Sequence, residues 1–211
     1  MPDCRFHADS RALYRTTSAG SERLAAPGVW RPADLPGDAR PLAPAAALAR
    51  MQADPALRLR VPVGVIGPRE EDPERNRVAE AAGRVLAQAG LTLICGGRTG
   101  VMEAASRGAA QVGGLVVGML PGDDPAEANA FVSVPVATGI GEARNVIIAR
   151  SAAALVAVGD SHGTLSEVAL GLRFGKTVFG LCGAPALPEV VHLDGVEALV
   201  PALAGLFLGP G

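Results

Sequence analysis

The chain has 211 residues, of which 49% are hydrophobic and 19% are charged, and its formal net charge is −2. This length and apolar content exclude a disordered chain and predict one folded domain of ordinary size, alone or with a small appendage. An aromatic content of 3% and a slightly acidic balance disfavour a nucleic-acid partner, because such partners are held by basic surfaces and by stacking on aromatic rings.

Residues 1–60 differ in character from the rest of the chain, since they carry 7 of its 17 prolines. Only two elements are predicted there: a short hairpin between residues 11–14 and 28–31, and a helix over residues 44–51. Neither element buries much apolar surface alone. We interpret residues 1–60 as an irregular, Pro/Ala-rich arm that packs on the main domain or on a second subunit, with a flexible tail as the alternative.

From residue 61 onward, strand and helix patterns alternate. Short apolar runs predict strands over residues 61–66, 91–95, 115–120, 131–136, 154–158 and 177–181, and a last extended piece over 190–193. Helices are predicted from the Asp72-Pro73 cap to Gly90 and over residues 101–112, 141–151, 164–174 and 196–207. Continuously apolar strands separated by helices predict an α/β fold over residues 61–211, a Rossmann-like, doubly wound parallel sheet with helices on both faces.

Three strand-to-helix loops converge at the carboxyl edge of such a sheet, where ligands bind. They contain Gly67; then Gly96, Gly97, Arg98, Gly100 and Met102; and finally Gly159, Asp160, Ser161, His162, Gly163 and Thr164. Glycine lets a ligand approach the backbone, and a helix N-terminus attracts an anion, so we interpret these residues as a phosphate- or nucleotide-binding site. No loop matches a P-loop or a dinucleotide-binding motif, so an ordinary tight turn is the alternative for each.

Two charged residues, Arg144 and Glu167, lie near the starts of predicted helices at the same edge. A guanidinium is poorly placed for the dipole of a helix N-terminus, but it can hold a phosphate or carboxylate through two hydrogen bonds. Thr164 and Glu167 also have the spacing of a capping box, which explains both residues without a functional role.

The three cysteines, Cys4, Cys95 and Cys182, are widely separated and have no metal-ligand spacing. The sequence therefore predicts neither a disulfide framework nor a metal site, and it suits a reducing compartment. Uncharged stretches are too short to cross a bilayer, and charges near the N-terminus interrupt any signal-peptide pattern. We therefore expect a cytoplasmic protein without a membrane partner.

Four motifs follow one another along the chain, at residues 96–105 (GGRTGVMEAA), 120–124 (LPGDD), 141–145 (GEARN) and 163–167 (GTLSE). In this order they resemble the motifs of the Lonely Guy-like (LOG/SLOG) superfamily. The chain looks most like the bacterial branch related to the molybdenum cofactor carrier, once labelled DprA-related, and the resemblance covers about residues 61–183.

The resemblance implies binding of a phosphorylated small molecule by a homodimer or higher homo-oligomer. In cytokinin-activating members it implies hydrolysis of a nucleoside 5′-monophosphate to free base and ribose 5-phosphate. Arg144 and Glu167 match the catalytic arginine and glutamate of those members, and a carboxylate beside the ribose stabilises the positive charge that N-glycosidic cleavage builds. The carrier branch holds a phosphorylated pterin in a similar cradle without turnover.

Three interpretations therefore stand: a phosphoribohydrolase, a non-catalytic carrier or sensor, and a homo-oligomeric scaffold with a degenerate site. No cofactor is required by any of them, and a nucleotide or molybdopterin is the expected ligand. An older family label, lysine decarboxylase, is rejected, because a pyridoxal phosphate enzyme needs a Schiff-base lysine. The only lysine, Lys176, is expected at the amino end of its strand, away from the ligand edge.

One turn departs from the superfamily pattern. Two or three glycines commonly precede the Gly-Thr pair, whereas here Asp160, Ser161 and His162 follow Gly159. A carboxylate at Asp160 would repel a phosphate at 4 Å by roughly 1 to 4 kcal/mol. The turn is either adapted to a different ligand or decayed, and the sequence favours neither.

Overall fold

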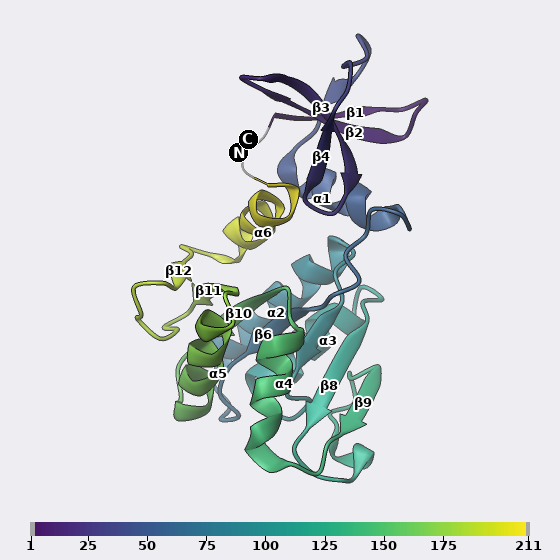
Figure 1. Cartoon of the computed structure of the whole chain (residues 1–211). Helices are drawn as coiled ribbons and strands as arrows, with labels where there is room; N and C mark the ends of the chain where they lie inside the picture. The colour runs from purple at the N-terminus through teal and green to yellow at the C-terminus, as the bar shows by residue number, and fades with distance from the viewer. Residues whose placement is uncertain (1–2, 210–211) are drawn as a thin grey trace. The chain divides into compact units, whose positions relative to one another are not determined.

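The structure is a computed structural model that describes residues 3–209. These residues divide into two compact units, one formed by the chain up to Leu59 together with the segment from Glu197 onward, and the other by Arg60–Val196. Figure 1 shows an antiparallel sheet in the first unit and a parallel sheet in the second. Within the described range, no helix is long and apolar enough to cross a membrane.

The first unit contains a five-stranded antiparallel sheet with the order β4-β3-β2-β1-β5. Its strands are β1 (Asp3–His7), β2 (Ala12–Thr17), β3 (Gly20–Ala26), β4 (Val29–Pro32) and β5 (Arg40–Pro41). Its helices are α1 (Pro44–Ala53) and α6 (Leu199–Leu208), the latter preceded by the 3-10 turn η3 (Val196–Ala198). The two helices contact each other, and both are rich in buried apolar residues.

The predicted hairpin between residues 11–14 and 28–31 is wrong, because β3 lies between β2 and β4 and pairs with both. The sequence of β3, GSERLAA, is polar apart from its last residues, and only Leu24 is buried, so it has no apolar run to reveal it. The helix expected over residues 44–51 is present as α1. The expected irregular arm is thus a folded sheet with a helix.

The closing helix groups with this first unit rather than with the parallel sheet where the sequence placed it. Trp30 on β4 donates its indole N–H to the carbonyl oxygen of Leu208, and Leu199, Leu203 and Leu208 are fully buried. The sequence pattern of an apolar helix does not reveal which surface the helix packs against, since any apolar surface can cover it.

The second unit contains a seven-stranded sheet with the order β12-β11-β10-β6-β7-β8-β9, in which every pairing is parallel. The strands are β6 (Val63–Ile66), β7 (Leu93–Cys95), β8 (Val116–Leu120), β9 (Val134–Ala137), β10 (Ala154–Val158), β11 (Thr177–Leu181) and β12 (Val191–His192). The predicted doubly wound α/β fold is confirmed.

Helices cover both faces of this sheet (Figure 1). They are α2 (Pro73–Gln88), α3 (Val101–Ala110), α4 (Arg144–Ser151) and α5 (His162–Arg173), with 3-10 turns η1 (Pro125–Glu127) and η2 (Gly141–Ala143). Leu155 and Ala157 of β10 pack into one core cluster with Ile148 of α4 and Val168 of α5, and all four are fully buried. The alternate residue Val156 is also fully buried, so the strand meets apolar layers on both faces.

Helices α2 and α3 approach so closely that glycine is required at their contact. A Cβ atom on Gly108 would lie 1.9 Å from the carbonyl oxygen of Glu80. We expect Gly108→Ala to lower the free energy of unfolding by about 1 to 3 kcal/mol, because overpacking outweighs the better helix propensity of alanine. Gly205 in α6 has no neighbour within 4 Å of such an atom. Gly205→Ala is therefore expected to raise the free energy of unfolding by up to about 1 kcal/mol, and urea denaturation followed by circular dichroism compares the two.

Candidate functional site

The winding of the parallel sheet reverses between its neighbouring strands β6 and β10. The chain leaves β6 toward β7 and leaves β10 toward β11, on opposite sides of this point. The loops after the two strands therefore diverge, and ligands of doubly wound folds bind in the crevice that results. A cavity of about 550 Å³ lies there, lined by Asp72, Glu74, Arg75, Gly159, Asp160, Cys182 and Gly183.

Arg144 and Glu167 are in contact. Arg144 is the first residue of α4 and Glu167 lies in α5, two helices that pack together. The Nη1 atom of Arg144 lies 3.4 Å from Oε1 of Glu167, and the two side chains are only 6% and 8% exposed. The same nitrogen donates a hydrogen bond of 2.6 Å to Oδ1 of Asn145. The fold thus brings together the two residues that the sequence singled out separately.

The guanidinium of Arg144 lies against the turn that follows β7. A Cβ atom on Gly96 would be 2.6 Å from Nη2 of Arg144 and 2.6 Å from the sulfur of Met102. Only glycine leaves room for this approach. We call the group formed by Gly96, Met102, Arg144, Asn145 and Glu167 the Arg144 cluster.

Burial dominates the electrostatics of the Arg144 cluster. Desolvation raises the pKa of Glu167 to about 7, although the charge of Arg144 acts in the opposite direction; Glu142 adds to the rise. This carboxyl group therefore keeps its proton to a higher pH than an exposed glutamate does. The Nε atom of Arg144 is buried and has no hydrogen-bond partner in the described part of the chain. The cluster can exchange a proton near neutral pH and has a free, charged donor.

The N-terminus of α5 is capped by Ser161. Its Oγ atom accepts the backbone N–H of Thr164 at 3.1 Å and lies 2.9 Å from the hydroxyl of Thr164. The helix begins at His162, so the predicted capping box of Thr164 and Glu167 is wrong, and Glu167 faces Arg144 instead. Thr164 is buried, whereas His162 and Gly163 are exposed.

The N-terminus of α3 is occupied by groups of the chain itself. The N–H of Gly100 donates to Oε1 of Glu71 at 3.1 Å, and the N–H of Val101 donates to the carbonyl oxygen of Pro68 at 3.1 Å. Gly100 has a φ of +65°, and a Cβ atom on it would lie 2.6 Å from the same carbonyl oxygen. The carboxylate of Glu71, which the sequence analysis missed, therefore occupies the position at the N-terminus of α3 where a bound anion was expected.

Three other predicted residues serve the architecture of the loops. A Cβ atom on Gly67 would lie 2.5 Å from Cγ1 of Val101, so this glycine allows close packing between a loop and α3. Gly97 turns the chain after β7 with a φ of +73°. Arg98 is directed to Glu127, with Nη1 and Oε2 3.9 Å apart. These contacts explain the three residues without a ligand.

Arg75 is the one basic residue of the cavity lining, and it is among the lining residues that sequence reasoning did not place in a site. Its side chain lies across Gly159, where a Cβ atom would be 2.4 Å from its Cδ atom. Its Nε atom is buried without a partner among the described residues, and its Nη2 atom lies 3.7 Å from a carboxylate oxygen of Asp72. Like Arg144, it is a cation in the first turn of a helix, which the helix dipole disfavours. An arginine directly after a predicted helix start is visible in the sequence, so this signal could have identified Arg75.

Acidic groups dominate the switch-point cavity. Asp72, Glu74 and Asp160 line it, and Arg75 is the one cation in the lining. Asp160 is exposed. An anion that enters this cavity meets three carboxylates and one guanidinium. Asp160, where the sequence differs from the superfamily pattern, therefore makes the cavity more negative.

Comparison with known proteins gives one family and several solved structures. A family model described as the SLOG cluster4 family matches residues 60–197. An uncharacterized protein of Archaeoglobus fulgidus is 47% identical over 119 residues, which make up 56% of this chain and 78% of that protein.

Two similar structures are of proteins that bind or carry the molybdenum cofactor. The molybdenum cofactor binding protein of Rippkaea orientalis is 34% identical, with a TM-score of 0.67, and the match covers 70% of this chain and 98% of that chain. The molybdenum cofactor carrier protein of Chlamydomonas reinhardtii is 36% identical, with a TM-score of 0.64 and the same coverage.

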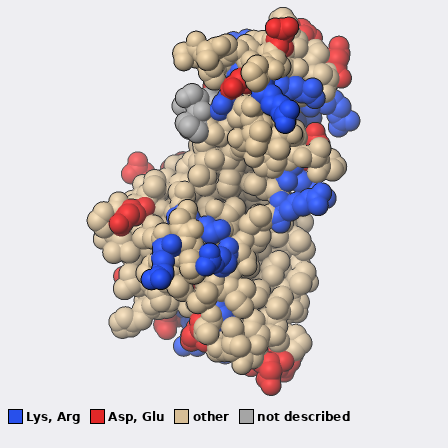
Figure 2. Space-filling model, viewed as in Figure 1, with Lys and Arg blue, Asp and Glu red and all other residues tan. Residues whose placement is uncertain are grey.

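A more distant structure is that of DNA processing protein A from Helicobacter pylori, described by its single-stranded DNA binding mode. It is 16% identical, with a TM-score of 0.54 over 75% of this chain and 84% of that chain, which shows a shared fold alone. On the face seen in Figure 2, basic side chains lie in separate patches with uncharged surface between them. The absence of a nucleic-acid partner, the homo-oligomer and the cytoplasmic location stay predictions.

Proposed function

Because the chain belongs to the SLOG cluster4 family, we propose that its parallel-sheet unit binds a phosphorylated small molecule at the carboxyl edge of the sheet and holds it without breaking it. The pterin cofactor of molybdenum enzymes is the first candidate, since two similar structures are of proteins that bind or carry it. A nucleoside 5′-monophosphate is the alternative ligand.

The buried guanidinium of Arg144, whose Nε atom has no acceptor in the described part of the chain, carries this proposal. Its Nη1 atom is held by Asn145 and Glu167, while its Nε atom lacks an acceptor within residues 3–209. A buried donor without an acceptor costs about 1 to 3 kcal/mol, so it persists where another requirement maintains it. A phosphate oxygen is one of the acceptors that a guanidinium binds strongly.

The burial and raised pKa of Glu167 disfavour one route of cleavage, in which a fixed, ionised carboxylate stabilises positive charge on the ribose. Stabilising the positive charge on a ribose requires an ionised carboxylate that reaches the sugar. Glu167 is buried and contacts Arg144, and desolvation raises its pKa to about 7, so it keeps its proton to a higher pH than an exposed glutamate does. A protonated carboxyl group instead donates a hydrogen bond, which suits recognition of a ligand oxygen.

The switch-point cavity, whose lining does not include the Arg144 cluster, has room for one small molecule. Its volume of about 550 Å³ lies within the range of ordinary ligand pockets. Arg75, with its buried Nε atom, supplies a second guanidinium for a charged group. The carboxylates of Asp72 and Asp160 repel phosphate oxygens, so a phosphate group would bind on the side of Arg75. Beside the carboxylates, the cavity favours hydrogen-bond donors of the ligand.

Mass spectrometry of the small molecules that copurify with the protein tests this function. We expect one phosphorylated pterin or nucleotide per chain, with its mass intact, and none in an Arg144→Ala variant that elutes at the same volume in gel filtration. Absence of any phosphorylated compound, both after purification and after incubation with AMP, would contradict binding. Release of free adenine above the level of a Glu167→Gln variant would show that the protein is a hydrolase instead.

Asp160 is expected to weaken phosphate binding. Because the side chain is exposed, its repulsion of a phosphate lies near the lower limit of about 1 kcal/mol. We expect Asp160→Gly to raise the affinity for AMP roughly fivefold, measured by isothermal titration calorimetry at low salt. The matched control is Asp194→Gly, which lies outside the cavity lining. Unchanged affinity in Asp160→Gly would show that the ligand phosphate lies away from this turn.

A further inference from the structure

A further cavity lies in the N-terminal unit. It has a volume of about 730 Å³ and is lined by Phe6, Ser10–Leu13, Arg23–Ala25, Arg31–Ala33, Arg50 and Ala53–Leu57. All of these residues belong to one compact unit, formed by the antiparallel sheet, α1 and the turn after α1. The cavity is therefore a feature of a single folded body.

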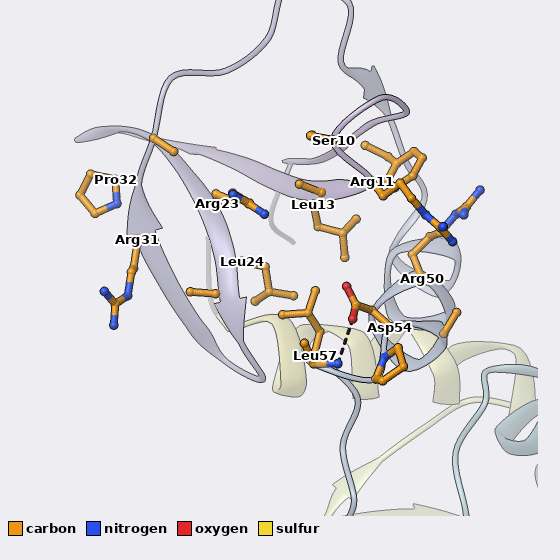
Figure 3. A pocket seen from close by; sticks show the side chains of 17 residues that line it. Ser10, Arg11, Leu13, Arg23, Leu24, Arg31, Pro32, Arg50, Asp54 and Leu57 are labelled. Carbon is orange, nitrogen blue, oxygen red and sulfur yellow. Dashed lines mark hydrogen bonds between the residues drawn. The ribbon is translucent and has the colours of Figure 1, made fainter.

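The floor of this cavity is apolar. Leu13 on β2 and Leu24 on β3 are each 2% exposed, and Leu57 after α1 is 9% exposed. Figure 3 shows the three side chains converging on the same hollow. Such a floor accommodates a hydrocarbon chain or ring, because it removes apolar surface of a ligand from water.

Four arginines line the same cavity: Arg11, Arg23, Arg31 and Arg50. All four are exposed, and none forms an ion pair with a carboxylate of residues 3–209. Arg23 and Arg31 stand directly opposite each other on β3 and β4, an arrangement that repulsion between like charges destabilises.

A neighbouring cross-strand pair on the same sheet has opposite charges. Arg15 on β2 faces Glu22 on β3, and their side chains form an ion pair of 2.7 Å. One carboxylate, that of Asp54, lines the cavity, and it accepts the backbone N–H of Ala56 at 2.9 Å (Figure 3). Arg23 thus lacks the partner that Arg15 has, and the cavity has more cations than anions.

We propose that this cavity binds one amphipathic carboxylate, a small organic acid with an apolar chain or ring. The hydrocarbon part lies over Leu13, Leu24 and Leu57, and the carboxylate is held by the arginines, with Arg23 on the strand side and Arg11 near the helix side (Figure 3). The arginine excess selects the anionic form of the ligand, and the apolar floor selects against inorganic anions.

Calorimetric titration of the full chain with dodecanoate tests the proposal. We expect one dodecanoate per chain, at least about tenfold tighter than the uncharged dodecanol, and no detectable binding of inorganic phosphate at this cavity. The only tryptophan, Trp30, lies in the same unit and reports binding independently by its fluorescence. Equal affinity for dodecanoate and dodecanol would overturn the role of the arginines, and no saturable binding of dodecanoate would overturn the site.

Variants locate the binding. Arg11→Ala/Arg23→Ala is expected to weaken dodecanoate binding at least about tenfold, whereas Arg11→Lys/Arg23→Lys keeps most of the affinity. Arg40→Ala removes an exposed arginine of the same sheet that is not in the lining, and it is expected to change nothing. Because the substituted side chains are exposed, the variants should fold, which circular dichroism checks. An equal loss in the Arg40→Ala variant would contradict the proposed site.

Discussion

Replacing Arg144 by alanine is expected to weaken binding of a phosphorylated ligand about 100-fold. Removing one partner of a buried, hydrogen-bonded charge pair costs about 2 to 5 kcal/mol, and each 1.4 kcal/mol changes the affinity tenfold. The guanidinium is buried, contacts Glu167 and has an unpartnered Nε atom in the described structure. Calorimetric titration with AMP, and with a phosphorylated pterin, measures the loss.

The matched control for this experiment is Arg150→Ala. Arg150 lies near the other end of the same helix α4, and its guanidinium stacks on the ring of Phe174, with 3.9 Å between Cζ and the ring centroid. Its loss should leave the affinity within about twofold of that of the unmodified protein, because it has no contact with the Arg144 cluster among the described interactions. Similar losses in both variants would point to a general effect on α4 and against a direct contact between Arg144 and the ligand.

Glu167 is expected to make the protein less stable as the pH rises from about 4.5 to about 7. The pKa of this carboxyl group is about 7 in the folded protein and 4.5 as its ordinary value. Below pH 4.5 both states are protonated and the contribution to stability is complete; as the pH rises, the unfolded chain releases its proton first, which favours unfolding. The expected loss is roughly 3 kcal/mol, since one pKa unit corresponds to about 1.4 kcal/mol.

The Glu167→Gln variant isolates this effect, because glutamine resembles the protonated acid and does not titrate. Urea denaturation measures the free energy of unfolding at pH 5 and at pH 8. Between these pH values the unmodified protein should lose most of the roughly 3 kcal/mol, and the Glu167→Gln variant should lose much less. Glu189→Gln, at an exposed position of the same unit, should behave like the unmodified protein. An equal pH dependence in Glu167→Gln and the unmodified protein would show that Glu167 is ionised in the folded state, and would remove the argument against catalysis.

Much of the parallel-sheet unit could be predicted because its signals are local. The bounds expected for β10 and β11, residues 154–158 and 177–181, agree with the structure, since both are short, largely apolar runs, the first followed by Gly159 and the second preceded by Lys176. Asp72 caps α2 as expected, with its Oδ1 atom 2.8 Å from the N–H of Arg75. The resemblance to the Lonely Guy-like superfamily and its molybdenum cofactor carrier branch is confirmed by the family match and the similar structures.

The parts that escaped prediction depend on contacts between distant segments. Strand β3 is stabilised by pairing with two neighbours rather than by an apolar pattern, and α6 joins a unit that begins nearly 200 residues earlier in the chain. Glu71 lies at the N-terminus of α3 through a single hydrogen bond to Gly100. Such long-range pairings have no periodic signature in a single sequence, so they are visible only in the fold.

Phosphorus NMR of AMP titrated with the protein tests the central claim most directly, because one spectrum reports both binding and turnover. We predict that the AMP resonance shifts or broadens until one equivalent is bound, that Arg144→Ala abolishes this change, and that no ribose 5-phosphate resonance appears over many hours. Appearance of ribose 5-phosphate that is lost in Glu167→Gln would contradict a holding function, and an unperturbed resonance for both AMP and a phosphorylated pterin would contradict the site itself.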